Sequence, residues 1–76
     1  MNKVRRSKLE KIAEAITDLK EQLETLQEEE EEYRDNMPEN LQGSERYEKA
    51  DEACDNLYTA VSNLEDAVDC INVATE

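Results

Sequence analysis

The 76-residue sequence contains no histidine, tryptophan or phenylalanine, and it has only one proline and one glycine. Without histidine, the chain lacks the side chain that most often serves as a general base and as a metal ligand. A single glycine cannot form a glycine-rich phosphate loop, and neither a G-x-S-x-G motif nor a D-x-D-x-D-G calcium loop occurs. These absences predict a protein that is not an enzyme and that has no catalytic residue, no cofactor and no specific metal site.

Long apolar segments are also missing. No stretch approaches the roughly 20 apolar residues that cross a bilayer, and no apolar segment typical of a signal peptide follows the basic N-terminal residues. We therefore expect a soluble, cytoplasmic protein that does not contact the membrane. Cys54 and Cys70 stand on one expected helix about 24 Å apart, far beyond the roughly 7 Å that a disulfide spans, so two reduced thiols are predicted.

Charge of one sign dominates the sequence, with a net charge of −12. Residues 1–11 carry +4, whereas residues 12–35 and residues 36–76 carry −8 each. A polyanion repels nucleic acid and anionic lipid and attracts basic surfaces. We expect no direct nucleic-acid binding, and the expected partner is a protein with a basic surface.

The apolar residues of the first half recur at alternating spacings of three and four. With Leu9 at heptad position a, the a and d positions are Leu9, Ile12, Ile16, Leu19, Leu23, Leu26, Glu30 and Tyr33. This period predicts one amphipathic helix over about 3–35. The run Glu28–Glu32 then belongs to solvated helical turns, with only Glu30 in the seam.

The second half repeats the same period and predicts a helix over about 45–75. Its a and d positions are Tyr47, Ala50, Cys54, Leu57, Val61, Leu64, Val68, Ile71 and Thr75. If the chain doubles back so that paired residue numbers sum to 80, every d of one helix faces an a of the other. The sequence therefore predicts an all-α fold, an antiparallel two-helix coiled-coil hairpin forming one domain over 1–76.

Residues 36–44 are the predicted bend. Asn36 ends the first helix before the Met37-Pro38 pair, since helix is disfavoured before proline. Pro38 opens a single helical turn, Gly43 can adopt a positive φ, and Ser44 is the N-cap of the second helix. Beside the two tyrosines of the seam, Met37 and Leu41 are expected to close the open end. At the opposite end, the hairpin would place the basic N-terminal segment next to Asp69 and Glu76, where charge pairing could help to fix the topology.

A row of alanines widens the apolar face of the second helix at position g. Small residues there either let the two helices approach closely or contact another helix. Because lone two-helix hairpins of this size are marginally stable, we expect a homodimer that forms a four-helix bundle. The expected oligomer interface comprises Ala53, Tyr58, Ala60 and Ala67.

The exposed acidic residues are the candidate partner-binding site. A rigid rod with carboxylates along its sides could imitate a nucleic-acid backbone and occupy a basic groove, although charge runs more often serve only solubility. The acidic residues that we expect to bind are Glu28, Glu29, Glu31, Glu32, Asp51, Asp55, Glu65 and Asp66. The alternative is a structural or assembly module that docks through the alanine-rich face of the second helix.

The stretch Tyr33-Arg34-Asp35-Asn36-Met37-Pro38-Glu39-Asn40-Leu41-Gln42-Gly43-Ser44-Glu45-Arg46-Tyr47, followed by Ala53-Cys54-Asp55-Asn56-Leu57, resembles a segment of small acidic helical proteins from phages and prophages of Firmicutes. The resemblance extends over the chain, but only the central bend is specific. It implies an accessory protein acting inside a bacterial cell. Small acidic phage proteins include anti-CRISPR and anti-restriction inhibitors, many of which mimic nucleic acid, and this analogy supports the groove-blocking hypothesis.

Overall fold

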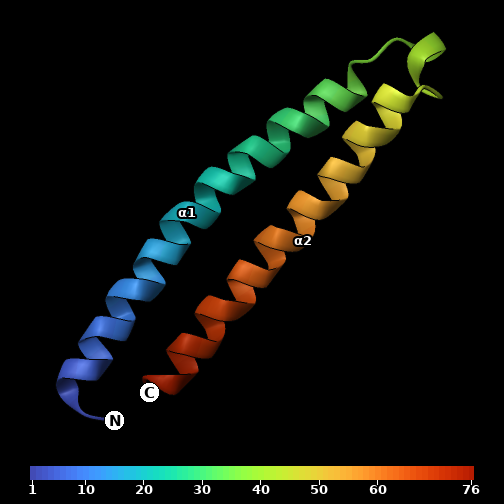
Figure 1. The fold of residues 1–76 in the computed structure, drawn as a ribbon. Coiled ribbons are helices and arrows are strands. Elements are labelled where there is room, and N and C mark those ends of the chain that lie inside the picture. Colours follow the sequence, from blue (N-terminus) through green and yellow to red (C-terminus); the bar gives the residue numbers. More distant parts are fainter.

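The computed structural model describes residues 1–76 and consists of two long helices joined by a short turn (Figure 1). Helix α1 spans Lys3–Asp35 and helix α2 spans Glu45–Ala74, with a single 3-10 turn, η1, at Glu39–Leu41 between them. The helices lie side by side and antiparallel, so both termini are at the same end of the molecule (Figure 1). The predicted all-α hairpin is confirmed, and both helices lie where the heptad patterns place them.

Polar side chains cap the helices as their positions in the sequence suggest. The side-chain oxygen of Asn2 accepts a 2.7 Å hydrogen bond from the backbone N–H of Arg5 at the start of α1. Ser44 is the N-cap of α2, and its Oγ accepts a hydrogen bond from the N–H of Tyr47 at 3.3 Å. Each cap satisfies one of the backbone donors that a helix start leaves without a partner.

The bend follows the prediction in outline, with two corrections. Asn36 ends α1, and Met37 is buried at the end of the hairpin as expected. Leu41 does not close this end, since it remains exposed. Gly43 does not adopt a positive φ, because the chain turns by continuing a helical path from η1, and the N–H of Ser44 donates to the carbonyl of Leu41 at 3.0 Å.

The molecule is a thin rod, and its core is correspondingly small. Its Cα atoms extend over 59 × 15 × 13 Å, and each helix has only one other helix against which to bury side chains. The buried residues are Ala13, Met37, Ala50, Cys54 and Val61. Most of them are small, which lets the two helix backbones approach closely.

Helix α2 presents the predicted face to α1, whereas α1 is rotated about its own axis relative to the prediction. All nine predicted a and d residues of α2 are buried or half-buried. On α1 the d residues lie outside the contact: Ile12 is 50 % exposed, Leu19 60 %, Leu26 56 % and Tyr33 47 %. Their place is taken by the e residues, which are buried or half-buried: Arg6, Ala13, Lys20, Gln27 and Arg34.

Side chains on both helices account for this rotation. Ala13 is small enough to be buried at the contact. Two e residues of α1 form ion pairs with α2: Nζ of Lys20 lies 3.7 Å from Oε1 of Glu65, and Nη1 of Arg34 lies 2.9 Å from Oδ1 of Asp51. These contacts require position e to face α2, and the predicted residue-by-residue seam is therefore wrong for the d row of α1.

The basic N-terminal segment, residues 3–11, forms no ion pair within the chain. None of its lysines or arginines lies within salt-bridge distance of an acidic group, and the expected pairing with Asp69 and Glu76 does not occur. The charges of this segment thus remain available to other molecules. Neither helix is long and apolar enough to span a membrane.

Candidate protein-binding surfaces

The rotation of α1 gives the rod two unlike long surfaces. One boundary between the helices carries the e positions of both, and we call it the acidic edge. Three shallow hollows follow one another along it: the first two share Thr17 and Val68, and the second and third share Glu65. The acidic residues lining them are Glu10, Glu14, Asp18, Glu24, Glu28, Glu31, Glu65 and Asp69. Lys20 is the only basic residue among the lining side chains.

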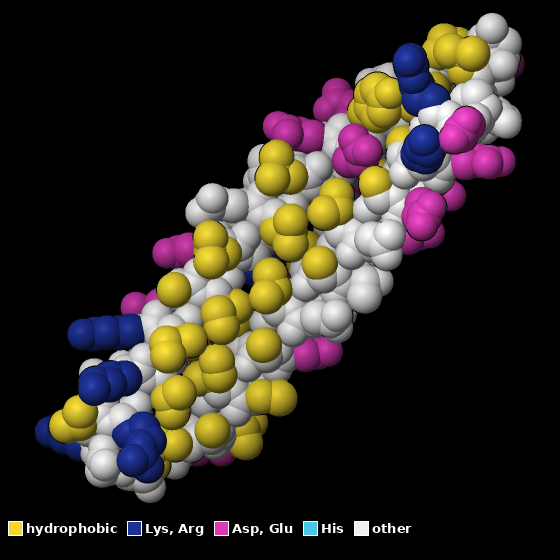
Figure 2. Space-filling model, viewed as in Figure 1, with side chains coloured by type: hydrophobic (Ala, Val, Ile, Leu, Met, Phe, Trp, Pro, Cys, Tyr) yellow, Lys and Arg dark blue, Asp and Glu magenta, His cyan; other side chains and the backbone are white.

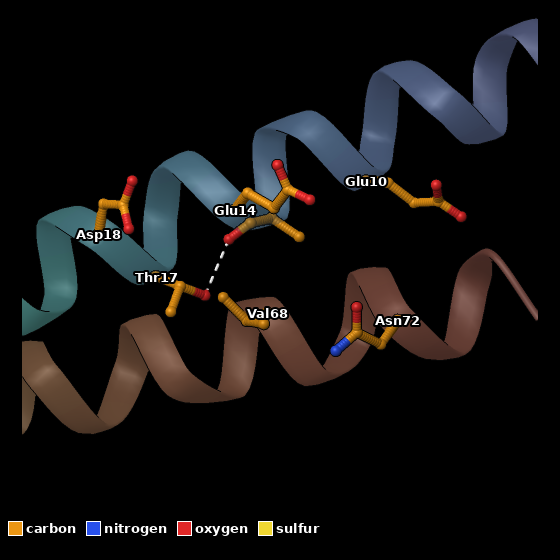
Figure 3. A pocket seen from close by; sticks show the side chains of 7 residues that line it. Glu10, Glu14, Thr17, Asp18, Val68 and Asn72 are labelled. Carbon is orange, nitrogen blue, oxygen red and sulfur yellow. Dashed lines mark hydrogen bonds between the residues drawn. The ribbon is translucent and has the colours of Figure 1, made fainter.

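Figure 3 shows the hollow nearest the N-terminus, which has a volume of about 350 Å³. Thr17 and Val68 approach one another across the two helices and form its floor, and Thr17 Oγ1 donates a 2.9 Å hydrogen bond to the carbonyl of Ala13. The carboxylates of Glu14 and Asp18 point away from α2 at the rim (Figure 3). The hollow is therefore narrow and apolar at its base, with anionic groups toward solvent.

The middle of the acidic edge holds the densest group of carboxylates. Glu24, Glu28 and Glu31 of α1 face Glu65 of α2 around one hollow. Nζ of Lys20 pairs with Glu24 at 3.0 Å, and this hydrogen bond is the main reason that the pKa of Lys20 is raised. One lysine leaves most of these carboxylates without a cation, so a basic side chain from another molecule would meet a favourable potential here.

Near the bend, Arg34 and Asp51 close the acidic edge with an ion pair. Hydrogen bonds to Asp35 first, and to Asp51 in addition, raise the pKa of Arg34 above its ordinary value. The guanidinium therefore stays charged at all accessible pH values and fixes the α1–α2 contact at this end. Since Asp51 already has this partner, it contributes less free negative charge than the glutamates beside it.

The structure brings together only part of the predicted acidic site. Glu28, Glu31 and Glu65 line the same hollow, and Asp51 lies at the end of the same edge. The other predicted residues are exposed but line no hollow of this edge: Glu29, Glu32, Asp55 and Asp66. The sequence reasoning missed Glu10, Glu14, Asp18, Glu24 and Asp69, although position b, which Glu10, Glu24 and Asp69 occupy, lies beside the seam.

The opposite long surface is apolar. Figure 2 shows hydrophobic side chains over both helices along most of the rod. This apolar face combines the row left outside the α1–α2 contact, Ile12, Leu19, Leu26 and Tyr33, with the alanine row of α2, Ala53, Ala60 and Ala67. Apolar surfaces of this length are uncommon on soluble monomers.

The four residues of the expected oligomer interface do not form one surface. Ala53, Ala60 and Ala67 are half-buried and belong to the apolar face. Tyr58, in contrast, is 66 % exposed and lines a hollow of the acidic edge with Glu24 and Glu28. An aromatic ring among carboxylates suits contact with a cationic group better than contact with an alanine row.

The two cysteines have different environments. Cys54 is buried at 3 % exposure in the centre of the α1–α2 contact, and burial raises the pKa of its thiol. Cys70 is exposed on α2. Reagents in solution can therefore reach the thiol of Cys70 but not that of Cys54.

No cluster of three or more potential ligand side chains is arranged to hold a metal ion. The carboxylates of the acidic edge are thus spread along the rod and not converged on a point. Such an arrangement suits a long complementary surface better than a small ligand.

The hairpin was also compared with known proteins. No protein-family model matches the chain, and no match was found among curated proteins or solved structures.

Proposed function

We propose that the protein acts by binding other proteins, with its acidic edge as the recognition surface for a basic groove. The observation that carries this proposal is the row of eight carboxylates against one lysine along a single boundary of a rigid rod. Opposite charge along a long surface accelerates association and selects partners of matching shape. The hollows between the carboxylates can receive the stems of lysine or arginine side chains.

The partner that fits this surface is a protein that handles nucleic acid. The rod has 59 Å of length for twelve net negative charges, or about one charge per 5 Å. Duplex DNA has about one charge per 1.7 Å and each of its strands about one per 3.4 Å. The hairpin is therefore closer in charge density to a single strand than to a duplex, and we propose a groove that accepts a single strand.

This function agrees with the resemblance to small acidic phage proteins. We propose an accessory protein that works in the cytoplasm of a bacterial cell and inhibits a nucleic-acid enzyme, in the manner of an anti-CRISPR or anti-restriction protein. Chemistry is not required of such an inhibitor, since occupancy of the groove excludes the substrate. The aromatic ring of Tyr58, which lies among the carboxylates, adds a surface on which an arginine guanidinium can stack.

The alternative function is a structural or assembly module. It is favoured by the apolar face, which is separate from the acidic edge and remains uncovered in the single chain. We also propose that two chains associate into a four-helix bundle, because a core of five buried residues gives one hairpin little stability. The acidic edge and the apolar face can serve binding and dimerisation at the same time.

Capture from a host lysate followed by mass spectrometry tests the proposal. The captured proteins should be nucleic-acid enzymes. The fraction that stays bound should fall steeply between about 50 and 200 mM salt. Single-stranded DNA should displace the captured proteins from the hairpin. The variant Glu24→Gln/Glu28→Gln/Glu31→Gln should lose them. The matched control Glu32→Gln/Glu52→Gln/Asp66→Gln removes as many charges away from the acidic edge and should retain them.

Equal losses in both triple variants would show that only net charge matters, and the acidic edge would not be a specific site. Binding that survives high salt and is lost in Ala60→Glu would instead support the assembly module.

A further inference from the structure

The apolar face carries large side chains on one helix and small side chains on the other, so the faces of two copies can fit together. On α1 it presents large side chains at seven-residue intervals, and on α2 it presents alanines at the same interval. In the hairpin, residues at the same height along the rod have numbers that sum to about 80. Ile12 is therefore level with Ala67, Leu19 with Ala60, and Leu26 with Ala53.

From this pattern we infer that two copies stack through their apolar faces around a two-fold axis parallel to the rod, with α1 of each copy on α2 of the other. This inference rests on the proposed dimer and specifies its surface and orientation. The rotation keeps heights along the rod unchanged, so each large side chain of α1 lies over an alanine of the second copy. Large side chains interdigitate best with small ones.

One pair of charges that flank the apolar face matches the same arrangement. Toward the bend, Figure 2 shows acidic side chains beside α1, and both basic and acidic side chains beside α2. Glu29 is at position g of α1 and Lys49 is at position c of α2, where a rotated copy places Lys49 close to the height of Glu29. Lys49 is 75 % exposed and pairs only with Glu45 of its own helix, so it can also contact the second copy.

The size of the rod is compatible with a dimer interface. The Cα extents of 59 Å and 15 Å bound one side of the rod with a projected area of about 900 Å². Stable interfaces cover about 800 Å² on each partner. A face that is covered by another copy also explains why three large apolar residues of α1, Ile12, Leu19 and Leu26, are half exposed or more in the single chain.

A different two-fold axis would place α1 on α1 and α2 on α2. That arrangement reverses one copy and brings the basic N-terminal end of each copy to the acidic bend end of the other, so charge complementarity alone permits it. It would, however, place large side chains against large ones between the two copies of α1, and alanines against alanines between the two copies of α2. The first contact would be crowded and the second would contain gaps. The size pattern therefore selects α1 on α2.

The preferred arrangement leaves both acidic edges free. The acidic edge faces away from the apolar face, so the dimer presents two such edges on opposite sides. One dimer can therefore bind two basic partners, and linked binding raises avidity where both partners are held on one assembly.

Cross-linking tests the arrangement directly. In a Cys70→Ser background, whose remaining Cys54 is buried, chains with Gln22→Cys are mixed with chains carrying Asn56→Cys and are oxidised. These positions flank the apolar face at similar heights, so the mixture should give a disulfide-linked heterodimer, and each variant alone should give none. Self-linking of either variant alone would overturn the inference in favour of α1 on α1.

Light scattering of the reduced full chain tests the surface. The parent should have twice the mass of the 8.8 kDa chain, and Leu19→Glu should raise the dissociation constant at least about 100-fold, because both copies lose a leucine and gain a carboxylate at the interface. Val73→Glu, at a residue that is 66 % exposed elsewhere on α2, should leave the dimer unchanged.

A charge exchange provides a variant that does not alter the apolar core. Glu29→Lys and Lys49→Glu should each weaken the dimer, and the double variant should restore it. A parent that is monomeric and helical at all concentrations, or a dimer insensitive to Leu19→Glu, would overturn the inference. Neither result would affect binding through the acidic edge, which the two triple glutamine variants measure separately.

Discussion

Arg34 of α1 donates a hydrogen bond from Nη1 to Oδ1 of Asp51 on α2 across 2.9 Å, and its Nε donates to Asp35 at 3.0 Å. This arginine is therefore the strongest polar link between the two helices, and it lies close to the bend. Together with the pair Lys20–Glu65 it holds position e of α1 against α2. Because these ion pairs hold α1 in its rotated position, they also determine where the acidic edge and the apolar face lie on the rod.

Arg34→Gln should lower the melting temperature measured by circular dichroism, because Asp51 loses its cation and the helices lose a bridge. The decrease should be small, since partly exposed ion pairs contribute little to stability, and it should diminish in high salt. Lys11→Gln is the control, because Lys11 is exposed on α1 and forms no ion pair. If Arg34→Gln and Lys11→Gln have the same effect, the interhelical pair does not support the fold.

Cys54→Ser should destabilise the protein by about 1–3 kcal/mol, because a hydroxyl replaces a thiol at a site that is only 3 % exposed. Urea denaturation gives the free energy of unfolding. The exposed Cys70 provides the matched control, and Cys70→Ser should be nearly neutral. A thiol reagent should modify Cys70 rapidly and Cys54 only as the hairpin opens.

The raised pKa of Cys54 predicts a pH dependence of stability. Below about pH 8.5, the ordinary thiol pKa, both states keep the proton and the contribution is fully present. As the pH rises further the unfolded chain loses this proton before the folded chain does, so the free energy of unfolding falls. Between about pH 8 and 10, Cys54→Ala should show a shallower fall than the parent; equal slopes would show that Cys54 does not titrate in this way.

Ala50→Leu should destabilise the hairpin by about 1–3 kcal/mol through overpacking, because Ala50 is 3 % exposed and lies where the helices approach. Ala15→Leu makes the same change at an exposed position of α1 and should have little effect on the free energy of unfolding. Tolerance of leucine at position 50 would mean that the helices do not pack closely there.

Gly43→Ala should stabilise the protein by about 0.4–1 kcal/mol, because alanine restricts the unfolded chain. The backbone permits the change, since φ of Gly43 is not positive and an added Cβ would meet no atom within 4 Å. Thermal denaturation measures the effect. A loss of stability would show that this glycine does need the freedom that the sequence suggested for it.

The sequence defines the helices and the bend because these depend on local properties. The period of apolar residues sets the two helices, Asn36 and Ser44 limit the bend, and Met37-Pro38 prevents one continuous helix. The antiparallel pairing also follows, since one register matches apolar residues along both helices. Small polar caps and a proline act on their own backbone neighbours and need no tertiary contact to be recognised.

Only the tertiary structure decided how α1 is rotated about its axis. A heptad pattern shows which residues share one side of a helix. It does not set the angle at which a broad apolar side meets the neighbouring helix, because rotation of the whole helix about its axis breaks none of its backbone hydrogen bonds. Contacts between the helices select the angle, and here Ala13, Lys20 and Arg34 bring position e to α2. The same rotation turns Ile12, Leu19 and Leu26 outward, and it gives the rod its separate apolar face and acidic edge.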